Sequence, residues 1–184
     1  NTMKIFILIL CLITTTVCQA QNLQPGCQSL PAVFTEQAPV IDGDLSDVCW
    51  QGLAPASGFI QKTPDEGQPS KEPTEIKVCY DYKNLYFAIY CHDQHADKIS
   101  SQIIPREEGD YGDIVIIMLD SYNDKRGAYK LFVNPKGIQG DAYVSEDGAN
   151  SDLSWNGVWF SAAKTDTGGW TAELAVPFKN LRFA

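Results

Sequence analysis

The sequence contains little positive charge. Among its 184 residues, 14 are Lys or Arg and 23 are Asp or Glu, which gives a formal net charge of −9. Arginine occurs three times, at Arg106, Arg126 and Arg182, and no run of basic residues is present. Because nucleic-acid binding depends on clustered Lys and Arg that release counterions from phosphates, this composition argues against a nucleic-acid partner.

The residues and motifs of common catalytic sites are also scarce. The two histidines, His92 and His95, lie where a predicted strand runs into a loop. They could form part of a zinc site, because imidazole suits zinc, but a solvated loop is the simpler interpretation. The motifs G-x-S-x-G, H-E-x-x-H, G-x-G-x-x-G and the P-loop do not occur. We therefore predict that this chain is not an enzyme, and that any hydrolase activity would lie in an attached domain.

The N-terminal apolar run is too short to span a membrane. Nine consecutive apolar residues, 5–13, follow Lys4, whereas a spanning helix needs about 20. This pattern is typical of a secretory signal peptide. We predict cleavage after Ala20, with a lipidated Cys18 as the alternative. Loss of Lys4 would change the net charge from −9 to −10. The protein is then expected to be exported, to the periplasm, the outer membrane or the extracellular space.

An oxidising compartment would permit disulfides among the remaining cysteines. These are Cys27, Cys49, Cys79 and Cys91. A hairpin that turns at residues 82–84 would place Cys79 opposite Phe87. In that register the sulfurs of Cys79 and Cys91 would lie on the order of 13 Å apart, too far to bridge. Cys27–Cys49 is the more plausible bridge, but the sequence favours four buried free thiols over it.

Helical periodicity is absent after residue 20, and the pattern is that of short strands. Apolar segments alternate with turn-forming residues. The predicted strands cover residues 74–80, 85–91, 114–119, 128–133, 138–144, 157–162 and 170–176. Segments 85–91 and 114–119 are apolar throughout, which predicts central strands. The sequence therefore predicts an all-β fold, a two-sheet antiparallel β-sandwich of immunoglobulin-like or jelly-roll type.

Turn chemistry and composition suggest the domain boundaries. In Asn134-Pro135-Lys136-Gly137, proline fixes φ at the second turn position and glycine relieves the exit, which predicts a hairpin. Residues 21–39 are polar and rich in proline. We predict a signal peptide at 1–20, a leader at 21–39 that lies along the domain edge, and a folded domain at 40–184.

Acidic side chains cluster in two predicted loops. Asp110 and Asp113 lie in the loop at 107–113, and Asp141 lies near a second group at 146–152. Carboxylate oxygens in loops are the ligands that Ca²⁺ prefers. Asp110, Asp113 and Asp141 are therefore candidate ligands of a structural Ca²⁺, and simple solvated loops are the alternative.

Tryptophan is concentrated near the C-terminal end. Trp155, Trp159 and Trp170 fall within sixteen residues. An aromatic ring can stack on the C–H face of a sugar while neighbouring polar groups bind its hydroxyls. Trp50 and Trp170 are expected in the core. Trp155 lies in a Ser/Asn/Gly loop, so it is the best candidate for a partly exposed platform.

Several motifs, taken in order, resemble the family 9 carbohydrate-binding module. They are Ile41-Asp42-Gly43-Asp44-Leu45 before Trp50, Tyr80-Asp81, Leu85-Tyr86, Asp93, residues 113–120, Gly169-Trp170-Thr171-Ala172-Glu173, and Pro177-Phe178 with Leu181. Three further motifs resemble the subgroup found at the N-terminus of bacterial outer-membrane β-barrel proteins. These are Asn134-Pro135-Lys136-Gly137 with Asp141, Trp155-Asn156-Gly157-Val158-Trp159, and Leu181-Arg182-Phe183.

The resemblance covers residues 40–184 and implies a β-sandwich that binds an oligo- or polysaccharide without catalysis, in some members with structural calcium. Sugar-binding members hold the sugar between two tryptophans. This sequence has Asp110-Tyr111 at the first position, and the second lies beyond its last residue. The residues expected to contact sugar are Tyr111, Trp155, Trp159, Glu173 and Asn134.

The resemblance also leaves other functions open. The chain could be a structural periplasmic or surface domain of an outer-membrane barrel protein, without sugar binding, or part of a glycoside hydrolase. The family adds at least one more strand after residues 181–184. We therefore expect the sandwich to lack its last strand here, and a C-terminal continuation of the chain, a barrel or a hydrolase, to follow.

Overall fold

The computed structural model describes residues 30–100 and 112–183. Within them it contains strands and four short 3-10 helices. No helix in these two ranges has the length and hydropathy that a membrane span requires. The predicted signal peptide, Cys27, Asp110 and Tyr111 lie outside the described residues.

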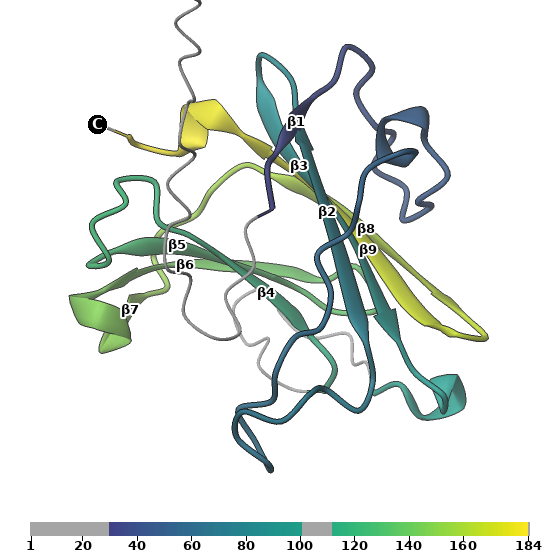
Figure 1. Cartoon of the computed structure of the whole chain (residues 1–184). Coiled ribbons are helices and arrows are strands. Elements are labelled where there is room, and N and C mark those ends of the chain that lie inside the picture. The colour runs from purple at the N-terminus through teal and green to yellow at the C-terminus, as the bar shows by residue number, and fades with distance from the viewer. Residues whose placement is uncertain (1–29, 101–111, 184) are drawn as a thin grey trace, which may run out of the picture.

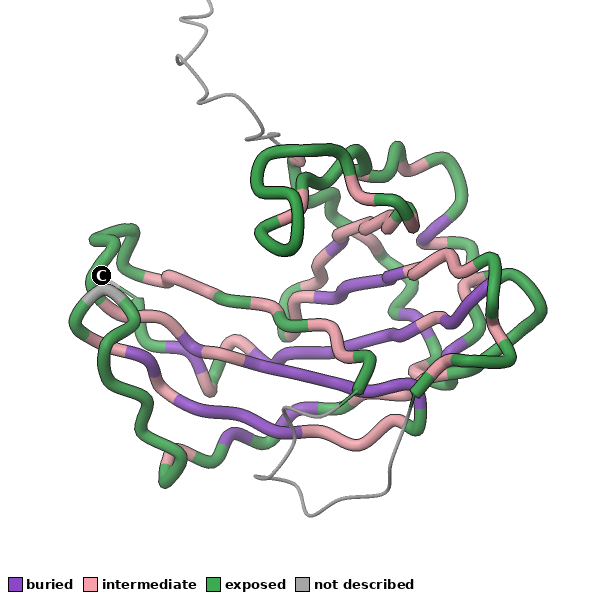
Figure 2. The backbone as a smooth tube through the Cα atoms, turned by 90° about the horizontal axis from the view of Figure 1, so that it is seen from below, coloured by how far each residue is buried: buried purple, intermediate pink, exposed green. Residues whose placement is uncertain are grey.

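The strands form two sheets that pack face to face (Figures 1 and 2). The first sheet has the order β1-β2-β3-β9-β8, with β1 at Val33–Phe34, β2 at Thr74–Tyr80, β3 at Asn84–His92, β9 at Gly169–Pro177 and β8 at Phe160–Asp166. The second has the order β4-β5-β6-β7, with β4 at Val115–Leu119, β5 at Ala128–Val133, β6 at Gln139–Ser145 and β7 at Asn150–Asp152. This confirms the predicted β-sandwich.

All strand pairs are antiparallel except β1 and β2, which run parallel. In β1, Val33 lies beside Cys79 and Phe34 beside Tyr80. A two-residue segment of the predicted leader therefore forms the edge of the first sheet. The 3-10 helices are η1 (Val48–Trp50), η2 (Ala96–Lys98), η3 (Glu146–Gly148) and η4 (Phe178–Asn180).

The main core lies between the sheets and follows the two-residue period of the strands. Alternate side chains of three strands point into it: Phe87 and Ile89 of β3, Tyr129, Leu131 and Val133 of β5, and Ala172, Leu174 and Val176 of β9. Figure 2 shows the buried residues along the middle of the strands and the exposed ones in the turns. Trp170 joins this core, as the sequence predicted.

A second cluster covers the outer face of the first sheet. Trp50 is fully buried there and packs with Cys79, Tyr86 and Ala88. The segment that carries Trp50 therefore acts as a lid on this face. This explains why β3 is buried on both faces, which its apolar sequence predicted, and it confirms Trp50 as a core residue.

The predicted register of β2 and β3 is wrong by one residue. Cys79 lies opposite Tyr86 instead of Phe87. The reason is the turn. The Asp81 carboxylate accepts hydrogen bonds from the backbone N–H groups of Lys83 and Asn84, both at 2.7 Å, and closes a tighter loop than expected. Cys49, Cys79 and Cys91 are all free thiols.

The apolar segment predicted as a central strand at 114–119 forms the edge strand β4. Among the described residues it pairs with β5 alone. Val115, Ile117 and Leu119 pack against the core, whereas Ile116 and Met118 are 41% and 55% exposed on the outer face. An apolar run shows that both faces are hydrophobic, but it does not show which face another layer covers.

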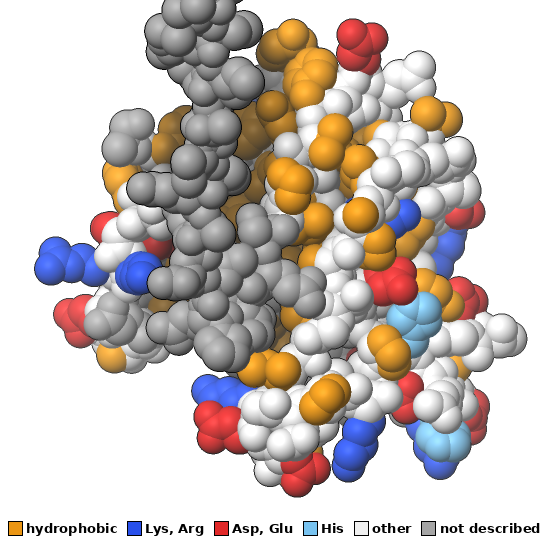
Figure 3. Space-filling view, viewed as in Figure 1, with side chains coloured by type: hydrophobic (Ala, Val, Ile, Leu, Met, Phe, Trp, Pro, Cys, Tyr) orange, Lys and Arg blue, Asp and Glu red, His pale blue; other side chains and the backbone are white. Residues whose placement is uncertain are grey.

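Charged side chains of both signs are interspersed on the face drawn in Figure 3. Several form ion pairs across loops, such as Lys71 with Asp65 at 3.8 Å. Such exposed pairs contribute little to stability, about 0–1 kcal/mol. The fold therefore depends mainly on its two apolar clusters.

Candidate functional site

An aromatic cleft lies beside the C-terminal segment of the described chain. It is lined by Tyr122, Tyr129, Tyr143, Asp152, Trp155, Lys179, Asn180 and Arg182. These residues come from the β4–β5 turn, three strands, the loop before β8, and the segment around η4. The cleft has a volume of about 520 Å³, which lies within the usual range for small-molecule sites.

Trp155 forms the aromatic platform of this cleft. Its side chain is half-buried, and its ring packs on Tyr129 with centroids 4.8 Å apart and planes tilted by 48°. Tyr129 in turn contacts Tyr143 edge-on at 5.4 Å. A ring packed in this way is fixed in orientation and still presents part of its surface to solvent. The prediction of Trp155 as a partly exposed residue is confirmed.

Two glycines make room for these rings. A Cβ on Gly157 would lie 2.6 Å from the Cη2 atom of Trp155, closer than carbon atoms can approach. A Cβ on Gly127 would similarly collide with the hydroxyl of Tyr143. Glycine is therefore required two residues after Trp155 for a steric reason, because the indole ring folds back over Gly157 and leaves no room for a Cβ.

Buried Asp141 anchors the loop that carries Trp155. Its carboxylate accepts a hydrogen bond from the indole Nε1 of Trp159 at 2.8 Å and one from the backbone N–H of Gly157 at 3.2 Å. Asp141 and Trp159 are 2% and 4% exposed, so neither presents a surface to a sugar.

Asn134, a predicted sugar contact, shapes the β5–β6 turn. Its side-chain oxygen accepts hydrogen bonds from the backbone N–H groups of Lys136 at 2.9 Å and Ile138 at 3.0 Å. The side chain is 2% exposed, and Gly137 adopts a φ of +74° that completes the turn. The predicted hairpin is confirmed, and its asparagine lies away from the aromatic cleft.

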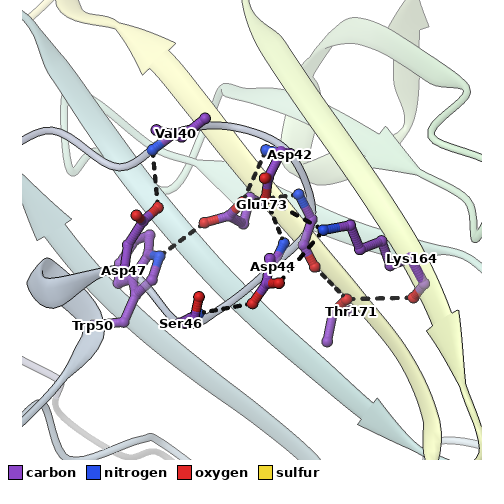
Figure 4. Close-up of polar contacts among 10 residues, drawn as sticks. Val40, Asp42, Asp44, Ser46, Asp47, Trp50, Lys164, Thr171 and Glu173 are labelled. Atoms are coloured by element: carbon purple, nitrogen blue, oxygen red, sulfur yellow. Dashed lines mark hydrogen bonds and ion pairs between the residues drawn. The ribbon is translucent and has the colours of Figure 1, made fainter.

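Glu173, another predicted sugar contact, fastens the lid over the first sheet (Figure 4). Its carboxylate accepts hydrogen bonds from the indole of Trp50 at 2.8 Å and from the backbone N–H groups of Asp42 at 3.1 Å and Gly43 at 2.9 Å. The side chain is fully buried. Burial raises its pKa, and these three hydrogen bonds oppose the rise.

The same lid is held at its surface by Lys164 of β8 (Figure 4). The ammonium group lies 3.6 Å from a carboxylate oxygen of both Asp42 and Asp44. Hydrogen bonds from Ser46, together with Lys164, lower the pKa of Asp44. The Ile-Asp-Gly-Asp-Leu motif therefore binds the lid to β8 and β9.

The predicted calcium ligands are not brought together where the structure describes them. Asp113 is exposed and accepts a hydrogen bond from the backbone N–H of Ser100 at 2.7 Å, Asp141 is engaged as above, and Asp110 lies outside the described residues. Residues 30–100 and 112–183 contain no group of three His, Cys, Asp or Glu side chains arranged to hold a metal.

Among the predicted sugar contacts, the structure therefore places Trp155 in the cleft. Trp159, Asn134 and Glu173 are buried elsewhere, and Tyr111 lies outside the described residues. The sequence reasoning missed the other cleft residues, which are Tyr122, Tyr129, Tyr143, Asp152, Lys179, Asn180 and Arg182. The sequence offered only a weak indication of these cleft residues. Tyr122 lies at a turn, and Tyr129 and Tyr143 lie on the two strands of a predicted hairpin.

Comparison with known proteins gives a consistent picture. The model of the family described as carbohydrate family 9 binding domain-like matches residues 41–184. No curated protein sequence matches the chain. Two solved structures of a family 9 carbohydrate binding module from Caldicellulosiruptor kristjanssonii, in complex with cellotriose and with glucose, share the fold. Each is 17% identical, with a TM-score of 0.56. The match covers 80% of this chain in both cases, with 67% of the cellotriose-bound chain and 69% of the glucose-bound chain.

Proposed function

Because this chain belongs to the carbohydrate family 9 binding domain-like family, we propose that it binds an oligo- or polysaccharide in the cleft around Trp155. The observation that carries this proposal is the ring of Trp155, which packs against Tyr129 and is partly exposed to solvent. An aromatic face of this kind stacks on the C–H face of a sugar.

The other lining residues supply the polar half of such a site. Tyr122 is 46% exposed, and Asp152, Lys179 and Arg182 are exposed as well. Hydroxyl, carboxylate and cationic groups can bind the hydroxyl groups around a sugar ring. The solved family members bind cellotriose and glucose, which supports a saccharide as the ligand of this cleft.

The role proposed is binding without catalysis. The family is described as a binding domain, and within residues 30–100 and 112–183 the cleft lining contains one carboxylate, that of Asp152. Hydrolysis of a glycosidic bond ordinarily needs two carboxyl groups on opposite sides of that bond. The domain would then bind a glycan non-covalently and bring it to the protein with which the domain is associated.

The test is calorimetric titration with glucose and with cello- and xylo-oligosaccharides. We expect saturable binding, and at least a tenfold loss of affinity, about 1.4 kcal/mol, in Trp155→Ala. Tyr82→Ala is the matched control, because Tyr82 is an aromatic residue that is 89% exposed outside the cleft. Absence of binding to every sugar, or equal affinity of the Trp155→Ala variant, would contradict the proposal.

We also propose that the protein is exported. Support comes from the sequence alone, from the apolar run at 5–13 and the small residue at Ala20. Expression of the whole chain in a bacterium with a secretion system, followed by N-terminal sequencing, should yield a product that begins at Gln21. An uncleaved cytoplasmic product would contradict it.

A further inference from the structure

The aromatic cleft has a positively charged rim. Lys179 and Arg182 both line it, on either side of Asn180. Neither forms an ion pair with any residue in the described part of the chain, where the Lys–carboxylate pairs involve Lys71 and Lys164. Two cations in one cleft, neither with an ion-pair partner among the described residues, are notable in a protein with a net charge of −9.

The backbone that carries these cations is fixed against the cleft. Leu181, between them, is buried in the main core. The backbone N–H of Arg182 donates a hydrogen bond of 3.1 Å to the hydroxyl of Tyr129, and the hydroxyl of Ser121 donates to the carbonyl of Arg182. The backbone at Arg182 is therefore fixed beside Tyr129, and the side chains of Lys179 and Arg182 both line the cleft.

The single carboxylate of the lining is already engaged. Asp152 accepts hydrogen bonds from the backbone N–H of Ser154 at 2.9 Å and from its hydroxyl at 2.6 Å. The cleft thus combines an aromatic platform with two cations and one acid that bonds to its own loop. This arrangement favours a ligand that is both a sugar and an anion.

We infer that the cleft selects acidic saccharides, whose uronic acid residues place a carboxylate against Arg182 and Lys179 while a sugar face stacks on Trp155. A guanidinium group can hold a carboxylate with two parallel hydrogen bonds, and an ammonium group adds a point charge. A neutral sugar offers these cations only hydroxyl groups, which form weaker hydrogen bonds with them than a carboxylate does. The inference rests on the proposed function, because it specifies the ligand of the same cleft.

The test uses pairs of ligands that differ in charge alone. Galacturonate oligosaccharides are compared with their methyl esters, and glucuronate-bearing xylo-oligosaccharides with theirs, at low and high salt. For at least one pair we expect the acid to bind tenfold or more tightly than its ester. This advantage should shrink at high salt, because ions screen exposed charges.

Substitutions of Arg182 and Lys179 then test whether these two cations cause the preference for acidic saccharides. Arg182→Gln and Lys179→Met should each reduce the advantage of the acid over the ester several-fold, because each should weaken binding of the acid more than binding of the ester. Lys136→Met, in the β5–β6 turn outside the cleft, is the control and should retain the full advantage.

The outcomes separate the two proposals. If the esters and neutral oligosaccharides bind as tightly as the acids, or if the variants keep the advantage, the inference is overturned and the proposed function stands. If neither acidic nor neutral saccharides bind, the proposed function fails and the inference fails with it.

Discussion

Asp141 accepts a hydrogen bond of 2.8 Å from the indole nitrogen of Trp159, and both side chains are buried. Glu173 and Trp50 repeat this arrangement at the same distance beneath the lid of the first sheet. In each case the carboxylate also accepts a backbone N–H from a neighbouring loop. Hydrogen bonds to a charged acceptor are stronger than neutral ones. Two buried carboxylates therefore tie two irregular segments to the sandwich.

Replacement of Asp141 by asparagine should loosen the Trp155 loop. Both N–H groups bond to the same carboxylate oxygen, Oδ2. The amide oxygen of asparagine can still accept them, but a hydrogen bond to a charged group is worth about 1.5–3 kcal/mol and one to a neutral group about 0.5–1.5 kcal/mol, so about 1 kcal/mol is lost. We expect a lower free energy of unfolding by that amount in urea titrations, together with weaker sugar binding. Asp97→Asn, at an exposed position in η2, is the control and should change stability by less than about 0.5 kcal/mol. Equal stability of both variants would contradict the anchoring role.

Gly157→Ala should move the platform without removing it. The added Cβ would collide with the Trp155 ring, so the indole must leave its place on Tyr129. We expect a changed near-ultraviolet circular dichroism spectrum and a loss of sugar affinity of about tenfold.

A double-mutant cycle checks this mechanism. If the glycine acts through the indole, Gly157→Ala should have almost no further effect on affinity in a Trp155→Ala background. Additive effects of the two substitutions would show that the glycine acts by another route.

Local chemistry explains which parts of this fold were predictable. The Asn134–Gly137 turn and the alternating strand at 74–80 depend on residues close in sequence, and both form as expected. The register of β2 and β3 failed by one residue because the Asp81 side chain, which the strand pattern does not reveal, selects the turn.

The cleft could not be predicted because its lining is assembled from distant segments. Tyr129 meets the backbone of Arg182, which lies 53 residues further along the chain, and Glu173 meets Trp50 across 123 residues. A carboxylate in sequence looks the same whether it faces solvent or an indole buried beside it. For this reason the sequence predicts a sugar contact at Glu173 and a Ca²⁺ ligand at Asp141, whereas in the structure each carboxylate accepts a hydrogen bond from a buried indole.

Glu173 should leave a signature in the dependence of stability on pH. Burial raises its pKa in the folded state above the ordinary value of 4.5, so the folded protein binds the proton more tightly than the unfolded chain does. Its contribution to stability is therefore fully present below pH 4.5 and is lost as the pH rises through the raised pKa.

The comparison with Glu173→Gln isolates this effect, because glutamine does not titrate. The free energy of unfolding of the wild type minus that of the variant should fall as the pH rises above about 4.5. Unfolding in urea at a series of pH values measures it. A difference that stays constant, or that grows with pH, would show that the folded state does not raise this pKa.

The buried thiols should be inert in the folded protein. Burial raises the pKa of Cys79 to about 12 and that of Cys91 to about 11. Because the thiolate is the reactive form, roughly one Cys79 in ten thousand would be reactive at pH 8. We expect iodoacetamide to label Cys79 at least a hundredfold more slowly in the folded protein than in urea, as measured by peptide mass spectrometry. An exposed cysteine introduced by Ser151→Cys should be labelled at similar rates in both states, and equal rates for Cys79 itself would refute its burial.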